Sequence, residues 1–172
     1  MPFGTAAAVA GHVNAIRQPG DLAVVSIHWG SNWGYRVPER QRAFAHALID
    51  AGACDVLHGH SSHHPRPAEV HRGRLILYGC GDFLNDYEGI EGYEEFRSDL
   101  TLAYLPQFSA DNVLEALALA PFRIRRFRLE RADAEATAWL LATLGRECAP
   151  FGTRISLAPG GRLAVNWSPD GR

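Results

Sequence analysis

Histidines gather in one short stretch of the chain, residues 55–65, which contains His58, His60, His63 and His64. Five of the eight histidines in the sequence fall between positions 58 and 71. Neutral imidazole is the commonest protein ligand for zinc-like metals, and it readily exchanges a proton near neutral pH. The stretch therefore predicts metal or phosphate chemistry. The alternative is a solvent-exposed polar loop that happens to be rich in histidine.

Strands are expected to deliver these histidines to one edge of a sheet. Val56 and Leu57 form a short apolar run typical of a buried strand, and Gly59 is expected to break that strand and let the backbone turn. His28 likewise follows the continuous apolar run 22–27, which predicts a strand covered on both faces. Open α/β sheets bind ligands beyond the carboxyl ends of their strands, so these strand-end histidines are expected to converge.

The sequence predicts a metal site of histidine ligands near a carboxylate. We expect His28, His60 and His63 to bind a divalent Mn, Zn or Fe ion, with His60 and His63 also taking part in catalysis. Asp82 follows Gly79 and Gly81. These glycines indicate either a close approach of the backbone to a ligand or simply a tight turn. His58 and His64 are second choices, whereas His12, His46 and His71 are expected to lie away from the site.

Aromatic residues leave the chain directly after His28. Trp29, Trp33 and Tyr35 are expected to border the same cavity as the histidines and, with Asp82, to contact the substrate. The alternative is that these rings simply cover the core.

The order of predicted elements indicates an α/β fold that becomes α+β toward the C-terminus. A helix at 5–16, a strand at 22–27, a helix at 38–51 and a strand at 53–58 predict a parallel crossover. The remaining expected elements are strands at 74–78, 100–105, 113–120 and 122–129, a helix from Asp133 through Leu144, and a hairpin of 154–157 with 162–167. Gly145 and Pro150 are expected to end that last helix.

Composition narrows the function classes. The 172 residues, 47% hydrophobic and 21% charged, suit one globular domain. A net charge of −2 makes no electrostatic case for nucleic acid. The absence of lysine excludes a lysine Schiff base. Cys54, Cys80 and Cys148 imply no disulfide framework, and no apolar stretch is long enough to span a membrane, so a cytoplasmic location is expected.

Three segments resemble the CapA capsule-synthesis family, whose members are described as poly-γ-glutamate synthesis proteins of the calcineurin-like metallophosphatase superfamily. They are VVSIHWG at 24–30, PERQRAFAHALIDAGACDVLHGHSSHHPR at 38–66 and AEVHRGRLILYGCGDFLND at 68–86. The resemblance implies a calcineurin-like αββα sandwich with a metal site at the sheet edges. It matches His28 to a strand-end histidine of the family and His63 to the last histidine of its loop. Ser61 stands where the family has a histidine, and Asp82 where it usually has an asparagine.

The resemblance also implies that the metal-binding motifs of an N-terminal half are missing. Residues 1–172 then form the C-terminal part of one CapA domain, with 150–172 a terminal hairpin extension and two metals in a full-length protein. This chain alone is expected to bind metal weakly, with Asp82 or Asp86 partly replacing the missing ligands. One hypothesis is a phosphoesterase-type hydrolase acting on a small molecule or an anionic polymer. A second is a non-catalytic accessory or binding module of polymer synthesis, and a third is a degenerate half-domain without activity.

Overall fold

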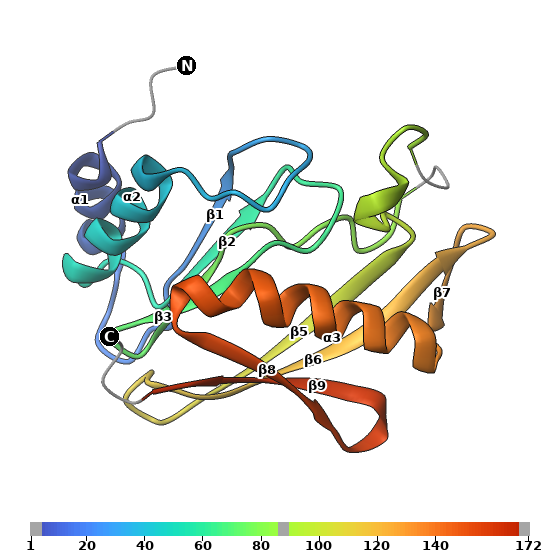
Figure 1. Ribbon diagram of the computed structural model, residues 1–172. Helices are drawn as coiled ribbons and strands as arrows, with labels where there is room; N and C mark the ends of the chain where they lie inside the picture. Colours follow the sequence, from blue (N-terminus) through green and yellow to red (C-terminus); the bar gives the residue numbers. More distant parts are fainter. Residues whose placement is uncertain (1–4, 86–89, 169–172) are drawn as a thin grey trace.

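Parallel pairing of three strands organises the first half of the protein. In the computed structural model, which describes residues 5–85 and 90–168, β1 (Val24–His28), β2 (Val56–His60) and β4 (Arg74–Leu77) run parallel. β3 (Ala68–His71) lies antiparallel to β4, so the strand order of this first sheet is β1-β2-β4-β3. The carboxyl ends of β1 and β2 consequently meet at one edge, as the predicted crossover requires (Figure 1).

Two helices pack beside the first sheet. α1 (Ala6–Ile16) begins at Thr5, whose side chain accepts a hydrogen bond from the backbone of Ala8, and α2 (Glu39–Asp50) links β1 to β2. Figure 1 shows α1 and α2 side by side next to β1. Their apolar residues share a core with one face of the sheet, which includes Leu48, Leu57 and Ile76. No side chain caps the N-terminus of α2, where Pro38 precedes the helix.

Antiparallel strands form a second sheet from residues 100–167. Its strands are β5 (Leu100–Phe108), β6 (Leu114–Arg125), β7 (Arg128–Arg131), β8 (Thr153–Ala158) and β9 (Arg162–Trp167), in the order β5-β6-β9-β8 with β7 also paired to β6. α3 (Ala134–Cys148) packs against β8 and β6 and crosses in front of this sheet in Figure 1. The short turns of 3-10 helix are η1 (Glu94–Phe96), η2 (Ala149–Phe151) and η3 (Pro159–Gly161). The protein is thus α+β, with helices packed on two sheets.

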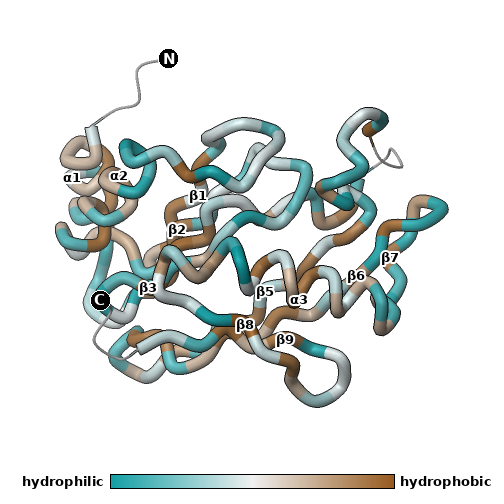
Figure 2. The backbone as a smooth tube through the Cα atoms, viewed as in Figure 1, coloured by the Kyte–Doolittle hydropathy of each residue, from teal (hydrophilic) through white to brown (hydrophobic). Residues whose placement is uncertain are grey.

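A second apolar core joins the two sheets and α3. It combines Leu75 and Leu77 of the first sheet with Leu102 and Leu119 of the second and Leu140 of α3. Figure 2 shows hydrophobic residues concentrated along the strands and α3, whereas the hairpin between β6 and β7 is largely hydrophilic. Burial of these side chains is the main source of stability for both sheets.

β6 is one continuous strand where the sequence suggested two. Pro121 lies inside it, although proline cannot donate to a strand ladder. The ladder with β9 ends at Leu119 and the ladder with β7 begins at Phe122. Pro121 therefore occupies the junction between two partner strands, where its carbonyl still accepts from Ala132 and its missing N–H group breaks neither ladder.

Three other elements differ from expectation. α3 continues through Gly145 to Cys148, because Leu144 and Cys148 are buried and their packing outweighs the helix-weakening glycine. β3 was not anticipated, since it lies in the segment expected to be a loop. β1 is an edge strand that alternates between exposed and half-buried residues, so the prediction that it is covered on both faces was wrong.

In the part of the chain that the structure describes, no helix is long and apolar enough to cross a membrane.

Candidate functional site

His28 and His60 face each other at the carboxyl edge of the first sheet. They are the last residues of β1 and β2 and are direct partners in the parallel register. Their Nδ1 atoms lie 3.3 Å apart, and the two rings meet edge to face with centroids 5.1 Å apart. Parallel pairing of equal-length strands therefore brings together two residues that are 32 positions apart in sequence.

The separation of these two nitrogens suits a metal ligand pair. Imidazole nitrogens bound to one tetrahedral zinc at about 2.0–2.1 Å lie about 3.3–3.4 Å apart. His28 is exposed and His60 half-buried, so a ligand can reach the pair from solvent. His28 and His60 thus fit two neighbouring positions of a tetrahedral site.

His63 lies in the loop after β2 and pairs with a carboxylate. Its Nδ1 lies 2.8 Å from Oδ2 of Asp82. A histidine that donates its Nδ1 hydrogen to a carboxylate keeps Nε2 as a lone-pair nitrogen for a ligand or a proton. Trp33 lies beside His63, with ring centroids 5.2 Å apart, and stacks on Tyr93 at 4.2 Å.

His64 belongs to the packed interior. It is fully buried, and burial lowers its pKa to about 4. Its ring lies among those of Trp33, Tyr35 and Phe96. Tyr35 is itself largely enclosed, and burial raises its pKa to about 12. His64 and Tyr35 consequently hold the base of the loop that carries His63.

The described residues supply two ligand-type pairs at this edge rather than one triad. Within 5–85 and 90–168, no group of three histidine, cysteine, aspartate or glutamate side chains is arranged to hold a metal ion. His58 instead contacts Ser26, with Nδ1 and Oγ 3.0 Å apart, and burial followed by the nearby His60 lowers its pKa. Asp86 lies outside the described residues. A metal site of His28, His60 and His63 stays a prediction.

Trp29 differs from the other two aromatic residues of its loop. Its side chain is only 3% exposed, and its indole N–H donates to the carbonyl oxygen of Tyr78 at 3.1 Å. Gly59 makes room for this ring, because a Cβ atom there would lie 2.5 Å from Nε1 of Trp29. Gly59 therefore lies inside β2 and allows close packing, which corrects the expectation that it breaks the strand.

The histidine loop packs directly on the glycines that follow β4. A Cβ atom on Gly79 would lie 2.4 Å from Oγ of Ser62, and one on Gly81 would lie 3.0 Å from the carbonyl carbon of His64. The close approach at these glycines is thus to the protein's own loop. Ser61 leaves β2 at a φ of 128°, an unfavourable value for a residue with a side chain.

Nothing in the sequence indicated that Arg66, in the loop after β2, and Gln41, in the first turn of α2, are buried. Arg66 is 2% exposed and Gln41 is 8% exposed, and both carry side-chain atoms that lack a hydrogen-bond partner in the described part of the chain. Arg66 lies between two prolines in a polar stretch, a context that gives no signal of burial. The remaining histidines lie elsewhere: His46 and His71 stack on each other at 3.9 Å, and His12 contacts Ala8 on α1.

Comparison with known proteins relates the chain to capsule synthesis. The family model described as "Bacterial capsule synthesis protein PGA_cap" matches residues 4–87. A Mycobacterium tuberculosis protein named "Probable polyglutamine synthesis accessory protein" is 52% identical over 158 residues, covering 91% of this chain and 41% of the relative. The "PGA biosynthesis protein CapA" of Bacillus subtilis is 34% identical over 92 residues, covering 54% of this chain and 23% of that relative. The chain therefore spans less than half the length of these relatives.

Proposed function

Because the chain belongs to the family of bacterial capsule synthesis proteins, we propose that it acts in making a capsule or poly-γ-glutamate polymer through a metal-dependent, phosphoesterase-type site. The site comprises His28, His60 and His63 at the carboxyl edge of the first sheet. Its substrate is a small molecule or an anionic polymer, and its metal is Mn, Zn or Fe. A longer protein of this family would hold one or two such ions.

The main support is the 3.3 Å separation of the Nδ1 atoms of His28 and His60. In the described part of the chain, neither ring has a hydrogen bond or ion pair with a carboxylate. Both nitrogens can therefore serve a cation without first breaking an ion pair.

In the proposed hydrolase, the residues of this edge have separate roles. His28 and His60 bind the ion, which when bound supplies positive charge to a phosphoryl oxygen and lowers the pKa of a water molecule. His63 is oriented by Asp82 and is the residue of this edge that would accept or donate a proton. Trp33 covers one side of His63 and limits access of bulk water.

A second candidate is a non-catalytic accessory module of the same synthesis. It is favoured by the finding that the described residues bring no third ligand to His28 and His60. The mycobacterial relative is itself named an accessory protein. In this case the fold is kept, but neither metal nor turnover is needed.

Metal content and hydrolysis separate the two candidates. The chain is loaded with Zn or Mn, desalted, and assayed for bound metal and for hydrolysis of bis-p-nitrophenyl phosphate. The H28A/H60A double variant removes both ligands, whereas H12A removes an exposed histidine of α1 as the matched control. A catalytic site predicts bound metal and turnover in the wild type and in H12A but not in H28A/H60A. Equal metal content and no turnover in all three proteins would support the accessory module.

A further inference from the structure

Arg66 is a buried cation without a counter-ion. Its side chain is 2% exposed, and within the described residues it forms no ion pair with an aspartate or glutamate. Among residues 5–85 and 90–168, the one hydrogen bond of its side chain runs from Nη2 to the backbone carbonyl of Arg36, and its Nε and Nη1 atoms have no partner there. Burial lowers the pKa of Arg66, as expected where a charge has lost its water.

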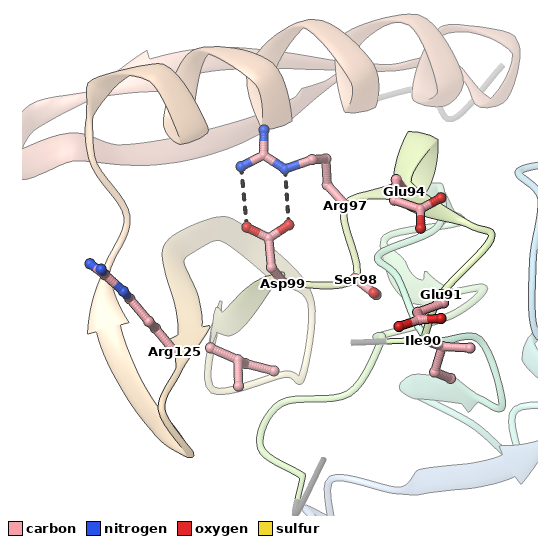
Figure 3. A pocket seen from close by; sticks show the side chains of 8 residues that line it. Ile90, Glu91, Glu94, Arg97, Ser98, Asp99 and Arg125 are labelled. Carbon is pink, nitrogen blue, oxygen red and sulfur yellow. Dashed lines mark hydrogen bonds and ion pairs between the residues drawn. The ribbon is translucent and has the colours of Figure 1, made fainter. Parts of the chain in front are cut away.

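Other arginines of this protein show the usual arrangement. Arg97 donates to both carboxylate oxygens of Asp99, at 2.9 and 3.2 Å (Figure 3). It also donates to Glu135 at 3.2 Å. This arginine lines a cavity of about 430 Å³ and is more exposed than Arg66. The more accessible guanidinium of Arg97 thus has two carboxylate partners, whereas the buried guanidinium of Arg66 has none among the residues that the structure describes. Buried charges are normally paired, so an anionic ligand is expected to pair with Arg66.

The unpaired Nη1 atom of Arg66 lies next to Gly30, a residue that lines a cavity. A Cβ atom on Gly30 would lie 2.7 Å from Nη1 of Arg66 and 3.0 Å from Nε2 of Gln41. Gly30 and Gln41 both line a cavity of about 550 Å³. Gln41 is 8% exposed, and its Oε1 atom is also without a partner. Gln41 therefore lines the cavity, whereas Arg66 is not itself a lining residue and lies behind Gly30, next to the cavity wall.

The rest of the cavity wall favours negative charge. Pro38, Arg40 and Gln41 line it at the start of α2, whose N-terminus has no side-chain cap. The backbone N–H groups of Gln41 and Arg42 donate to the carbonyl of Pro38. The N–H groups that precede them in α2, together with the helix dipole, attract anions. Arg36 and Arg40 add two exposed cations to the wall, and none of the described lining residues is acidic. Glu39 of the same helical turn is exposed and does not line the cavity.

We propose that this cavity is a binding site for an oxyanion group, held at its wall by the N-terminus of α2 and the side-chain amide N–H of Gln41, with the guanidinium of Arg66 reaching the group past Gly30. A phosphate group and a carboxylate group share the required chemistry, which is a set of negatively charged oxygens that accept hydrogen bonds from arginine. Trp29 and Phe44, which also line the cavity, give the adjoining part of the ligand an apolar contact. The site requires neither a metal ion nor hydrolysis at His28 and His60, so it can be tested separately from the proposed function.

Titration calorimetry in the presence of EDTA tests the site. The probes are inorganic phosphate for the phosphoryl group and glutarate for the carboxylate, each in a chloride buffer. We expect saturable binding of at least one probe that weakens as the salt concentration rises. Tighter binding of phosphate assigns the site to phosphoryl ligands, and tighter binding of glutarate assigns it to carboxylate ligands. No saturable binding of either probe would overturn the proposal.

Variants identify which residues hold the anion. R66M is expected to weaken binding at least about tenfold, because a charged hydrogen bond is lost. R40Q should weaken it about threefold, since its charge lies at the exposed wall. R154Q removes an exposed arginine of β8 as the matched control and should bind like the wild type.

A second variant tests the anion site if R66M fails to fold. Circular dichroism first shows whether R66M is folded, which we expect because an unpaired buried cation adds little to stability. If R66M is unfolded, the R36Q/R40Q double variant replaces it, and undiminished binding in that protein overturns the site. Binding that survives in R66M but is lost in H28A/H60A would place the anion at the histidine edge and overturn the proposal. Binding unchanged in H28A/H60A and lost in R66M supports it.

Discussion

Histidine pairs occur at both ends of the first sheet, but their surroundings differ. At the carboxyl edge, His28 and His60 contact each other. In the described part of the chain, neither of them pairs with a carboxylate. At the opposite end, His71 closes β3 beside the first residue of β4 and stacks on His46 of α2. There His46 lies 3.0 Å from Glu69, and His71 lies 2.9 Å from Asp50.

The difference indicates a structural role for His46 and His71, whereas His28 and His60 are the pair proposed to bind a metal ion. Glu69 is 3% exposed and accepts hydrogen bonds from Arg42, at 2.8 Å, and from Tyr78, at 2.6 Å, in addition to its contact with His46. This network joins α2 to the first sheet. In the described residues, the nitrogens of His28 and His60 contact each other but link no helix to the sheet through a carboxylate, so their removal is expected to cost less stability.

The largest effect is expected from a substitution that disrupts the network around His46 and His71. The E69Q substitution removes a buried charge that Arg42, His46 and Tyr78 all contact, and it presents an amide N–H group to their donors. We expect a loss of about 3 kcal/mol in the free energy of unfolding, measured by urea denaturation at pH 7. H28A/H60A is the control, and its loss should stay below about 1 kcal/mol. A larger loss in H28A/H60A than in E69Q would reverse the comparison.

Acid should weaken the same network. Burial by itself raises the pKa of Glu69, but the hydrogen bonds from Tyr78 and Arg42 outweigh it, and the pKa lies below its ordinary value. The resulting stabilisation is present above the pKa of the unfolded carboxyl, about 4.5, and is lost as the pH falls through the lowered value. Denaturation curves from pH 7 to 3 should therefore show a smaller decline for E69Q than for the wild type. Parallel declines in the two proteins would contradict this assignment.

Zinc should distinguish the two pairs with a moderate effect. At a free zinc concentration of about ten times the dissociation constant, binding at His28 and His60 adds about 1.4 kcal/mol to the free energy of unfolding. H60A should lose this increment, whereas H46A should keep it although it is less stable without zinc. The measurement is the midpoint of urea unfolding with and without zinc at pH 7.5. A zinc increment that survives in H60A would exclude the carboxyl edge as the metal site.

The smallest effect concerns backbone strain beside His60. Ser61 has a φ of 128°, which glycine tolerates much better than serine. S61G is expected to raise the free energy of unfolding by about 1 kcal/mol. S61A keeps the Cβ atom and loses the hydroxyl, so it should bring no gain. If S61A stabilises the protein as much as S61G, the backbone at this position is not strained.

Local patterns predicted the elements that are stabilised locally. The apolar stripe of α2, the capping aspartate of α3 and the apolar run of β4 each matched the structure to within a few residues. The convergence of His28 and His60 also followed from the sequence, because parallel strands align their carboxyl ends. These features depend on neighbours along the chain or on a single pairing rule.

Features that depend on distant contacts were not foreseen. β3 is short and follows Pro67, so its sequence resembles a loop until β4 supplies its partner. The run that forms β1 is apolar, yet it lies at the edge of the sheet and stays half exposed. The burial of Arg66 arises because Gly30 and Gly79 leave space from two different segments, which no local pattern records.

The two edges of the first sheet differ in whether another strand can be added. At the β3 edge, the backbone N–H group of Ala68 donates to Sγ of Cys148, and its carbonyl accepts from the hydroxyl of Thr153. α3 and β8 therefore occupy the backbone groups that a further strand would need. In the described residues β1 has a strand partner on one side only, and an unpaired strand side is a template for pairing. The sheet can consequently be extended in one direction only, and a strand added there would lie beside His28.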